Sequence, residues 1–490
     1  MVTQPEMRTA TLMAGTGRRC TNPPPNIAHG GWGAQKHEQA EGIDMDLWAT
    51  ALALSDGTTT AIILDVDIQI LTNERADQMR HAVSQRTGVA AENIRACATH
   101  THSGPVPYQS WIEKGYEMVG PWFEQLARWC ADAAAEAMAN LQPVVVRVGR
   151  GESLINASRR CVAPTGERFL GVNLDAPCDH EVIVVRFDPV SAAAGSRAPA
   201  ATLVNFACHA TIMGPANRLI TPDYPGAMKR VVEHAVGGRC IFLQGSAGDI
   251  GPRQGFQADV AVYRELGAVL GHEIAKIALG LISIPSAVKW REIIPSGAPL
   301  GQYDSEFADS AGNPVQVRYK EIAVPLRAAL PDRKVATEQL EHWKQKLKSA
   351  RERTDAAGIT EAIYMARRAD IQLRMADDFG GKTSAMVRAH FITFGDVALV
   401  GCNIEPFCEI GLAIKRESPF PVTFMCGYTN GRMAYMPTAA EWAKGGYEVE
   451  NSPFGQSAAE KLQAEIIGEL RSLRAARANF EGRGHEDHPD

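Results

Sequence analysis

The chain has 490 residues, of which 45% are hydrophobic and 22% are charged. These values are ordinary for a globular protein and exclude a disordered, collagen-like or coiled-coil chain. Lysine and arginine total 50 against 56 aspartate and glutamate residues, which gives a net charge of −6. Because there is no basic excess or stripe, the composition argues against a dedicated nucleic-acid binder. The sequence therefore predicts a mildly acidic globular protein of enzyme size.

The ten cysteines are scattered, and no pair has C-x-x-C spacing. We expect most of them to be small buried hydrophobes rather than disulfide partners. The first residues, Met1–Thr11, are polar and contain no apolar core of a signal peptide, so we expect no secretory signal. The longest apolar stretches, such as Val260–Ile284, are interrupted too often by polar residues for a membrane span. We therefore expect a cytoplasmic protein with no stable membrane association.

The first half of the chain alternates strand and helix patterns. Short apolar or β-branched runs bounded by turn residues predict strands, and apolar residues at helical spacing predict helices. In chain order, the expected elements are strands at Trp48–Ser55 and Thr59–Asp67, a helix at Asn73–Thr87, a strand at Asn93–Ala98, a helix at Pro121–Leu141, strands at Val144–Val148, Glu181–Phe187 and Ala201–Cys208, a helix at Thr221–Val236, a strand at Arg239–Leu243 and a helix at Val260–Leu281. This alternation predicts an α/β fold, with a layered mixed sheet core flanked by helices.

The second half departs from the alternation. Ser296–Pro314 is rich in Gly, Pro, Ser and Asp, which predicts a loop. Leu330–Asp378 is charged and favours helix, so we expect a helical hairpin at 330–380, inserted on the surface with a solvated charged face. The remaining expectations are a strand at Ala389–Val400, an amphipathic helix at Gln456–Leu473, one domain over residues 1–473 and a disordered tail over residues 474–490.

Two of the 13 histidines lie in the segment A-T-H-T-H-S-G-P, which follows the predicted strand that ends at Ala98. Side chains two residues apart on a strand point to the same face, so His100 and His102 can converge on one metal ion. A polar turn at a strand end is the equally weighted alternative. A second strand delivers His209 to its tip, where a core histidine is the competing interpretation. The adjacent Cys208 points to the opposite face and is poorly placed as a catalytic partner.

Three later segments carry further candidates. Leu243–Pro252 is a glycine-rich loop without the G-x-S-x-G or P-loop pattern, so Asp249 is its chemically useful residue, unless that side chain caps a helix. Glu405 follows an apolar strand and offers an oxygen ligand, with a solvated or capping carboxylate as the alternative. Tyr435 and Tyr447 follow later, and on sequence alone they are ordinary aromatic residues.

These segments, in this order, resemble the neutral/alkaline (non-lysosomal) ceramidase family over roughly Ala10 to Leu473. The H-T-H-S-G-P segment is the most specific match. The N-x-x-x-H, G-D-x-x-P and N-x-x-x-x-Y…Y-E segments support it in combination, and the segment around Glu405 matches only loosely.

The resemblance implies a ligand set and a group of catalytic residues. One zinc ion per chain would be held by His100, His209, Glu405 and Tyr435. The resemblance also implies that His102 hydrogen-bonds the reacting amide. The other residues that it places in the catalytic site are Asp249, Tyr447 and Arg159, with the neighbouring Arg160 as the alternative to Arg159.

Two departures from the family pattern bear on function. Gly251 stands where the family has the serine of G-D-x-S-P, so we expect no serine nucleophile at this position. We also expect neither the family's C-terminal immunoglobulin-like domain nor its secretion signal in this chain. Both expectations disfavour a membrane-lipid substrate.

The sequence thus predicts a zinc-dependent hydrolase that cleaves a carbon–nitrogen amide (N-acyl) bond by attack of metal-activated water. The expected partner is a small soluble amide rather than ceramide. No nucleic-acid partner is expected, and a homo-oligomer is left open. Two alternatives remain: an esterase or lactonase that uses the same zinc site, and a ceramidase-like binding protein without catalysis.

Overall fold

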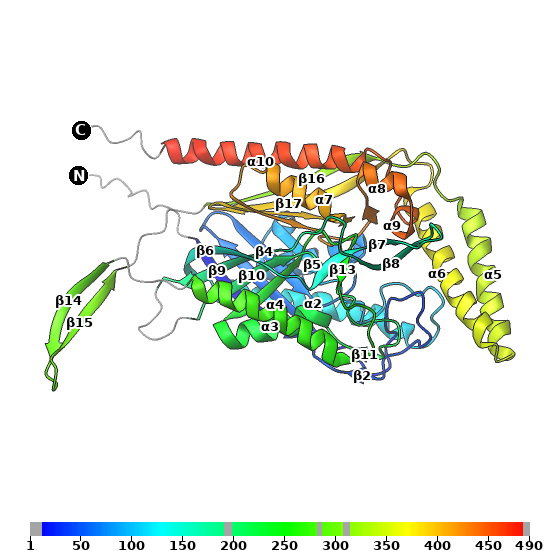
Figure 1. Ribbon diagram of the computed structural model, residues 1–490. Coiled ribbons are helices and arrows are strands. Elements are labelled where there is room, and N and C mark those ends of the chain that lie inside the picture. Colours follow the sequence, from blue (N-terminus) through cyan, green and yellow to red (C-terminus); the bar gives the residue numbers. More distant parts are fainter. Residues whose placement is uncertain (1–11, 191–197, 282–286, 307–313, 484–490) are drawn as a thin grey trace.

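The computed structural model describes residues 12–190, 198–281, 287–306 and 314–483. Two β-sheets pack face to face, and helices cover the outer face of each sheet (Figure 1). The central part of the protein therefore has four layers, in the order helix, sheet, sheet, helix. This arrangement confirms the predicted α/β class with a layered mixed sheet core.

The larger sheet has eight strands in the order β12-β10-β9-β6-β1-β3-β4-β5. The pairs β4–β5 and β10–β12 are parallel, and the other pairs are antiparallel, so the sheet is mixed. The strand bounds are β1 (Met13–Cys20), β3 (Trp48–Ser55), β4 (Thr60–Val66), β5 (Ile94–Ala98), β6 (Gln142–Glu152), β9 (Glu181–Pro189), β10 (Ala201–Phe206) and β12 (Arg239–Gln244).

The smaller sheet has the order β16-β17-β18-β20. Its bounds are β16 (Val315–Pro325), β17 (Ser384–Phe394), β18 (Val397–Cys402) and β20 (Val422–Cys426). The strand predicted at Ala389–Val400 is therefore wrong as a single element. Gly395, whose φ of 52° suits a tight turn, and Asp396 separate two antiparallel strands there.

Alternate side chains of one strand belong to different layers. On β3, Ala49, Ala51 and Ala53 pack towards the helices, whereas Leu52 and Leu54 pack towards the smaller sheet. This division follows from the two-residue period of a strand. Because both faces are buried, the strands of the sheet carry nearly continuous apolar sequences.

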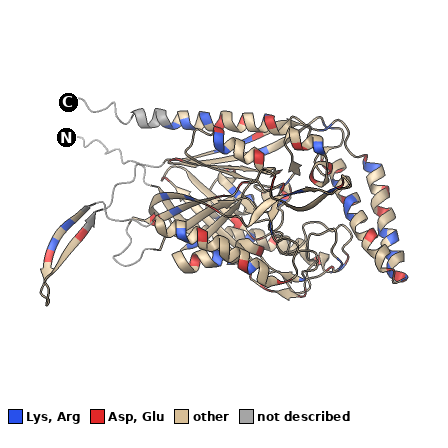
Figure 2. Cartoon of the chain, in the orientation of Figure 1, with Lys and Arg blue, Asp and Glu red and all other residues tan. Residues whose placement is uncertain are grey.

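Helices cover the two outer faces. On the larger sheet they are α1 (Asn73–Thr87), α2 (Val119–Ala139), α3 (Asp223–Val236) and α4 (Val260–Gly280), and on the smaller sheet α7 (Cys408–Glu417) and α10 (Ala458–Arg483). The predicted helical hairpin is present as α5 (Arg333–Glu352) and α6 (Ala356–Phe379), and charges of both signs are interspersed along it (Figure 2). No helix in the described part of the chain is long and apolar enough to cross a membrane.

Two expectations on the second half need correction. The helix predicted to end at Leu473 continues to Arg483, because the next residues are mostly alanine, arginine and glutamate, which favour helix. Residues 484–490 of the predicted tail lie outside the described residues. Part of the loop predicted at Ser296–Pro314 is instead the strand β15 (Leu300–Glu306), which pairs with β14 (Ala287–Ile294) in a two-stranded ribbon.

Short strands complete the fold around one end of the sandwich. They are β2 (Gly42–Ile43), β7 (Asn156–Val162), β8 (Arg168–Asn173), β11 (Leu219–Ile220), β13 (Ile250–Pro252), β19 (Glu405–Pro406) and β21 (Tyr435–Met436), and two short helices follow as α8 (Ala439–Lys444) and α9 (Tyr447–Glu450). All ten cysteines are free, as the scattered spacing predicts.

The carboxyl ends of β5 and β10 meet, although the two strands are far apart in the sheet order. The Asp65 carboxylate on β4 accepts a hydrogen bond from the Phe242 N–H on β12 (2.9 Å). Beyond the strand ends, the Gln244 amide donates to the carbonyl of Thr99 (3.3 Å). The loops that follow β5, β10 and β12 are therefore brought together, which is where α/β proteins commonly place their ligands.

Candidate metal centre

His100 and His209 face each other through their Nε2 atoms, which lie 3.0 Å apart in a fully buried position. Each Nδ1 is next to a backbone carbonyl, that of Gln69 for His100 (2.7 Å) and that of Ala247 for His209 (2.5 Å). A carbonyl only accepts, so each ring holds its proton on Nδ1 and presents a lone pair on Nε2. Two facing lone pairs at this distance repel each other unless a cation lies between them.

Burial and the neighbouring histidine lower the pKa of His100 to about 3, and burial together with Arg159 lowers the pKa of His209. Both imidazoles are therefore neutral at pH 7. A proton on one of the two Nε2 atoms is therefore not what relieves the repulsion between the facing lone pairs. Neutral imidazole is also the form that binds a metal ion.

Glu405 supplies the third atom of the cluster. Its Oε2 lies 3.6 Å from each of the two Nε2 atoms, is buried and has no hydrogen-bond partner. Its Oε1 accepts a hydrogen bond from Nε of Arg432 (3.0 Å). Burial alone would raise the pKa of Glu405, but Arg432 and the two histidines hold it well below its ordinary value. The site therefore contains a buried carboxylate anion with one oxygen free.

These three atoms fit a zinc ion. A tetrahedral zinc with ligands at about 2.0–2.1 Å separates neighbouring ligand atoms by about 3.3–3.4 Å. The observed separations of 3.0, 3.6 and 3.6 Å lie on either side of that value. Two neutral imidazoles and one carboxylate are also a ligand set found in catalytic zinc sites.

His102 belongs to the same cluster but has a different environment. Its Nε2 lies 3.3 Å from Nε2 of His100, and the three histidines together form a possible metal-binding group. The Gln69 amide nitrogen lies close to both ring nitrogens of His102, 3.1 Å from Nδ1 and 3.4 Å from Nε2. The hydrogen bond from His102 to the reacting amide stays a prediction.

The rings of His100 and His102 converge, but not because they share one face of a strand, as the sequence predicted. β5 ends at Ala98, and both histidines follow in a loop rather than on the strand. His100 has a φ of 70°, in the left-handed region that non-glycine residues rarely occupy. A strained backbone of this kind persists where the surrounding structure enforces it, which is common at functional sites. The turn, not strand alternation, aims His100 at His209.

Tyr435 lies beside the cluster because β19 and β21 are paired in parallel, with Glu405 opposite Tyr435. Its ring stacks with His209 at a centroid distance of 6.4 Å. Tyr447 is one ring further out, 5.9 Å from Tyr435 and 40% exposed. Tyr435 is thus placed in the wall of the site, and its role as a zinc ligand stays a prediction.

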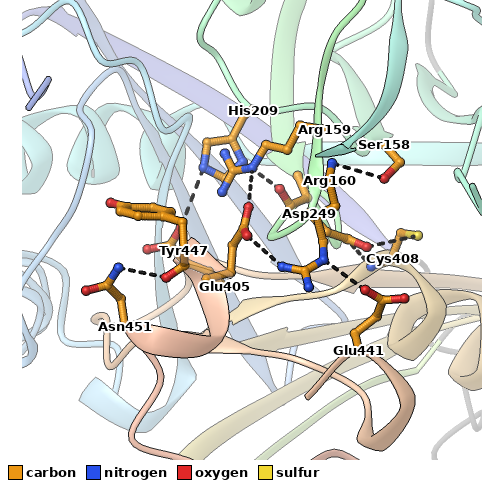
Figure 3. Close-up of polar contacts among 12 residues, drawn as sticks. Ser158, Arg159, Arg160, His209, Asp249, Glu405, Cys408, Glu441, Tyr447 and Asn451 are labelled. Atoms are coloured by element: carbon orange, nitrogen blue, oxygen red, sulfur yellow. Dashed lines mark hydrogen bonds and ion pairs between the residues drawn. The ribbon is translucent and has the colours of Figure 1, made fainter. Parts of the chain in front are cut away.

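Arg159 and Arg160 lie close together (Figure 3), and they share the buried carboxylate of Glu448. Nε of Arg159 donates to Oε1 and Nη1 of Arg160 donates to Oε2, at 2.9 and 2.8 Å. Arg159 also lies over the Tyr435 ring, 5.4 Å from its centroid, whereas Arg160 turns to Glu441 (2.8 Å). Of the two, Arg159 is therefore the arginine that lies beside Tyr435, and its catalytic role stays a prediction.

Asp249 makes the contacts of a helix cap. Its Oδ1 accepts a hydrogen bond from the backbone N–H of Cys408 (2.7 Å), the first residue of α7, and the Cys408 thiol lies 3.8 Å from Oδ2. Burial raises the pKa of Asp249 to about 7. Among the described residues, no hydrogen bond or ion pair joins this carboxyl to His100, His209 or Glu405. Its assignment as the base that activates water stays a prediction, and the capping alternative has the geometric support.

Replacement of Asp249 by asparagine is expected to leave kcat close to the wild-type value, because asparagine keeps the capping oxygen. Loss of a general base would instead lower kcat by about 10²–10⁴-fold. Because the folded pKa lies above the ordinary value, the contribution of the carboxyl to stability declines as pH rises towards 7. Asparagine cannot ionise, so at pH 8 the variant should unfold at the same or a higher temperature. If Asp249→Asn instead lost most of its kcat with an unchanged KM, Asp249 would be the general base.

Gly251 lies on β13, which pairs with β7. A Cβ at this position would meet only the Arg159 side chain, at 3.6 and 3.7 Å, which is ordinary contact. A serine would therefore fit. Steric crowding therefore does not explain why glycine stands here instead of the family's serine, and the difference between the two is the missing hydroxyl.

Four residues of the site were not among the predicted site residues, although Arg432 and Glu448 lie in the segments that carry the resemblance. Tyr428 packs its ring 4.1 Å from that of His100 and brings its hydroxyl within 3.5 Å of His209 Nδ1. The others are Gln69, Arg432 and Glu448. Each acts through a partner that is distant in sequence, so only the fold reveals it.

The fold and the ligand set define a mixed α/β protein with a buried metal-type centre at the carboxyl ends of its strands. Residues 13–258, half of the chain, match the model of the neutral/alkaline non-lysosomal ceramidase family, N-terminal region. The chain belongs to this family, which confirms the resemblance. Family membership indicates a hydrolase that acts on amide (N-acyl) bonds.

Individual relatives are consistent with this membership. The neutral ceramidase of Pseudomonas aeruginosa is 24% identical over 473 residues, covering 89% of this chain and 68% of the relative. Neutral ceramidase A of Dictyostelium discoideum is 27% identical over 177 residues, covering 33% and 24%. The crystal structure of the Pseudomonas aeruginosa neutral ceramidase superposes with a TM-score of 0.67 at 18% identity, over 95% of this chain and 75% of that one. This superposition supports the fold.

Proposed function

We propose that the protein is a zinc-dependent hydrolase of N-acyl amides, with one zinc ion held by His100, His209 and Glu405. The observation that carries the proposal is the cluster of three buried acceptor atoms, two imidazole nitrogens and one carboxylate oxygen, with no proton between them. Tyr435, whose ring stacks with that of His209, is the fourth ligand in this proposal. When bound, zinc supplies Lewis acidity, which polarises a carbonyl and makes hydroxide available near neutral pH.

The residues of this chain supply binding and charge. In this proposal His102 donates a hydrogen bond to the oxygen of the substrate amide. Arg159, held in place by Glu448, brings a positive charge beside Tyr435 and stabilises the negative charge that develops on that oxygen. Glycine at position 251 removes the serine hydroxyl, so water is the nucleophile in this proposal.

Removal of the metal tests the proposal. The purified protein is expected to contain about one zinc per chain, to lose amide hydrolysis on dialysis against a chelator and to regain it with zinc. A substrate panel with ceramide, short N-acyl amides and the esters of the same acids then separates the amidase from the esterase or lactonase. Full activity in the chelated protein would refute the zinc proposal. An inactive zinc-loaded protein would favour the binding-protein alternative.

A further inference from the structure

Arg367 reaches the site from α6, in the helical hairpin whose charges the sequence assigns to a solvated face. Its Nη2 donates a hydrogen bond to the carbonyl of Gly31, and its Cδ lies 3.6 Å from the position that a Cβ on Gly33 would occupy. The guanidinium is therefore folded onto the loop that contains Trp32, rather than extended into solvent.

This loop connects Arg367 to the catalytic cluster. The Trp32 ring lies 4.9 Å from the ring of His102. Gly31 packs directly on Gln69, since a Cβ at Gly31 would lie 2.6 Å from its Oε1, and Gln69 in turn contacts His102. Arg367 is therefore separated from His102 by a single layer of side chains.

Among the residues that the structure describes, a buried donor without an acceptor and a cation without a carboxylate partner lie at this loop. The indole N–H of Trp32 is buried and has no hydrogen-bond partner. Within the described part of the chain, no aspartate or glutamate pairs with Arg367, whose only hydrogen bond is the one to the Gly31 carbonyl. The indole N–H and the guanidinium are both donors, so neither group can satisfy the other.

The neighbouring arginines, by contrast, have carboxylate partners. On α6, Arg368 pairs with Glu450 at 3.1 Å and Arg374 pairs with Asp370. Within the cluster, Arg432 pairs with Glu405 and Arg159 with Glu448. Burial lowers the pKa of Arg367, Arg374 adds to this effect, and Tyr447, Asp370 and Tyr435 oppose it. Asp370 is itself paired with Arg374, so Arg367 has no ion-pair partner of its own among the described residues.

We propose that Arg367 and the indole N–H of Trp32 bind a carboxylate group of the substrate. This inference rests on the proposed amide hydrolysis and narrows its substrate class to N-acyl amides that carry a carboxylate near the scissile bond. The carboxylate belongs either to the amine part, as in an N-acyl amino acid, or to the acyl part, as in the monoamide of a dicarboxylic acid. Guanidinium and carboxylate match in planar geometry and charge, which a neutral hydroxyl does not.

The test compares three substrates of similar size on the zinc-loaded protein. They are N-butanoylglycine, N-propylsuccinamic acid and the neutral N-butanoylethanolamine. The wild-type protein is expected to favour one of the two carboxylates over the neutral amide by about 10- to 100-fold in kcat/KM. The preferred carboxylate identifies which part of the substrate carries the group. Equal rates for all three amides would overturn the inference.

The variant Arg367→Gln is expected to lose this preference mainly through a higher KM for the carboxylate, with the neutral amide nearly unchanged. Arg367→Lys should restore part of it. The matched control is Arg368→Gln, on the same helix, whose side chain is exposed. Equal losses on charged and neutral amides in Arg367→Gln would overturn the assignment, because a merely structural role affects both.

Equilibrium binding separates failure of this inference from failure of the proposed function. Titration of the wild-type protein and of Arg367→Gln with N-butanoylglycine and with N-propylsuccinamic acid needs no turnover. Weaker binding of either carboxylate by the variant supports the subsite even if no amide is cleaved. Equal binding of both by the two proteins refutes it even if amides are cleaved.

Discussion

Replacement of His209 by alanine is expected to abolish zinc retention and to lower kcat/KM for amides by at least about 10³-fold. The reason is that the variant keeps only His100 and Glu405 of the three close donor atoms. A catalytic metal contributes several kcal/mol of stabilisation to the transition state, and each 1.36 kcal/mol is about tenfold in rate. Zinc content by mass spectrometry and steady-state kinetics measure the two effects.

The control for this variant is His234→Ala, because His234 lies exposed on α3, away from the cluster. It should retain both zinc and activity. A His209→Ala protein that keeps a full complement of zinc and normal kinetics would remove His209 from the ligand set, and the proposed centre with it.

Replacement of Glu448 by glutamine is expected to lower the free energy of unfolding by about 3–5 kcal/mol, because it leaves buried charge without a partner. Glu448 is buried and lies between the guanidinium groups of Arg159 and Arg160. Glutamine keeps the shape but not the charge. Chemical denaturation of the wild-type and variant proteins measures the difference.

Glu450→Gln on the same short helix is the matched control. Glu450 pairs with Arg368 at the surface, where such a pair contributes about 0–1 kcal/mol. We therefore expect little change in that variant. If Glu448→Gln were as stable as Glu450→Gln, the two arginines would not depend on Glu448, and the explanation for the position of Arg159 would fail.

The layered core was accessible from the sequence because its strands and helices carry strong periodic patterns. α1 spans Asn73–Thr87 and β3 spans Trp48–Ser55, both as predicted. The sequence also places His100 and His209 at strand ends. Conversely, β17 and β18 were predicted as one strand, although the Gly395–Asp396 dipeptide between them is a typical turn signal.

The assembly of the site was not accessible in the same way. Glu405 and Tyr435 become neighbours through two strands of only two residues each, which no periodicity reveals. His100 depends on a left-handed backbone conformation that the strand pattern does not predict. Arg367 lies on a helix whose charged residues resemble a solvent-exposed face, and only the packing of α6 against the loop at Gly31 distinguishes it.

Anomalous diffraction at the zinc absorption edge, from crystals of the purified protein, tests the central claim most directly. We predict one peak per chain, within bonding distance of Nε2 of His100, Nε2 of His209 and Oε2 of Glu405. A peak bound by His100, His102 and His209, with Glu405 left on Arg432 alone, would contradict the proposed ligand set. An active protein with no peak at this position would contradict the metal centre itself.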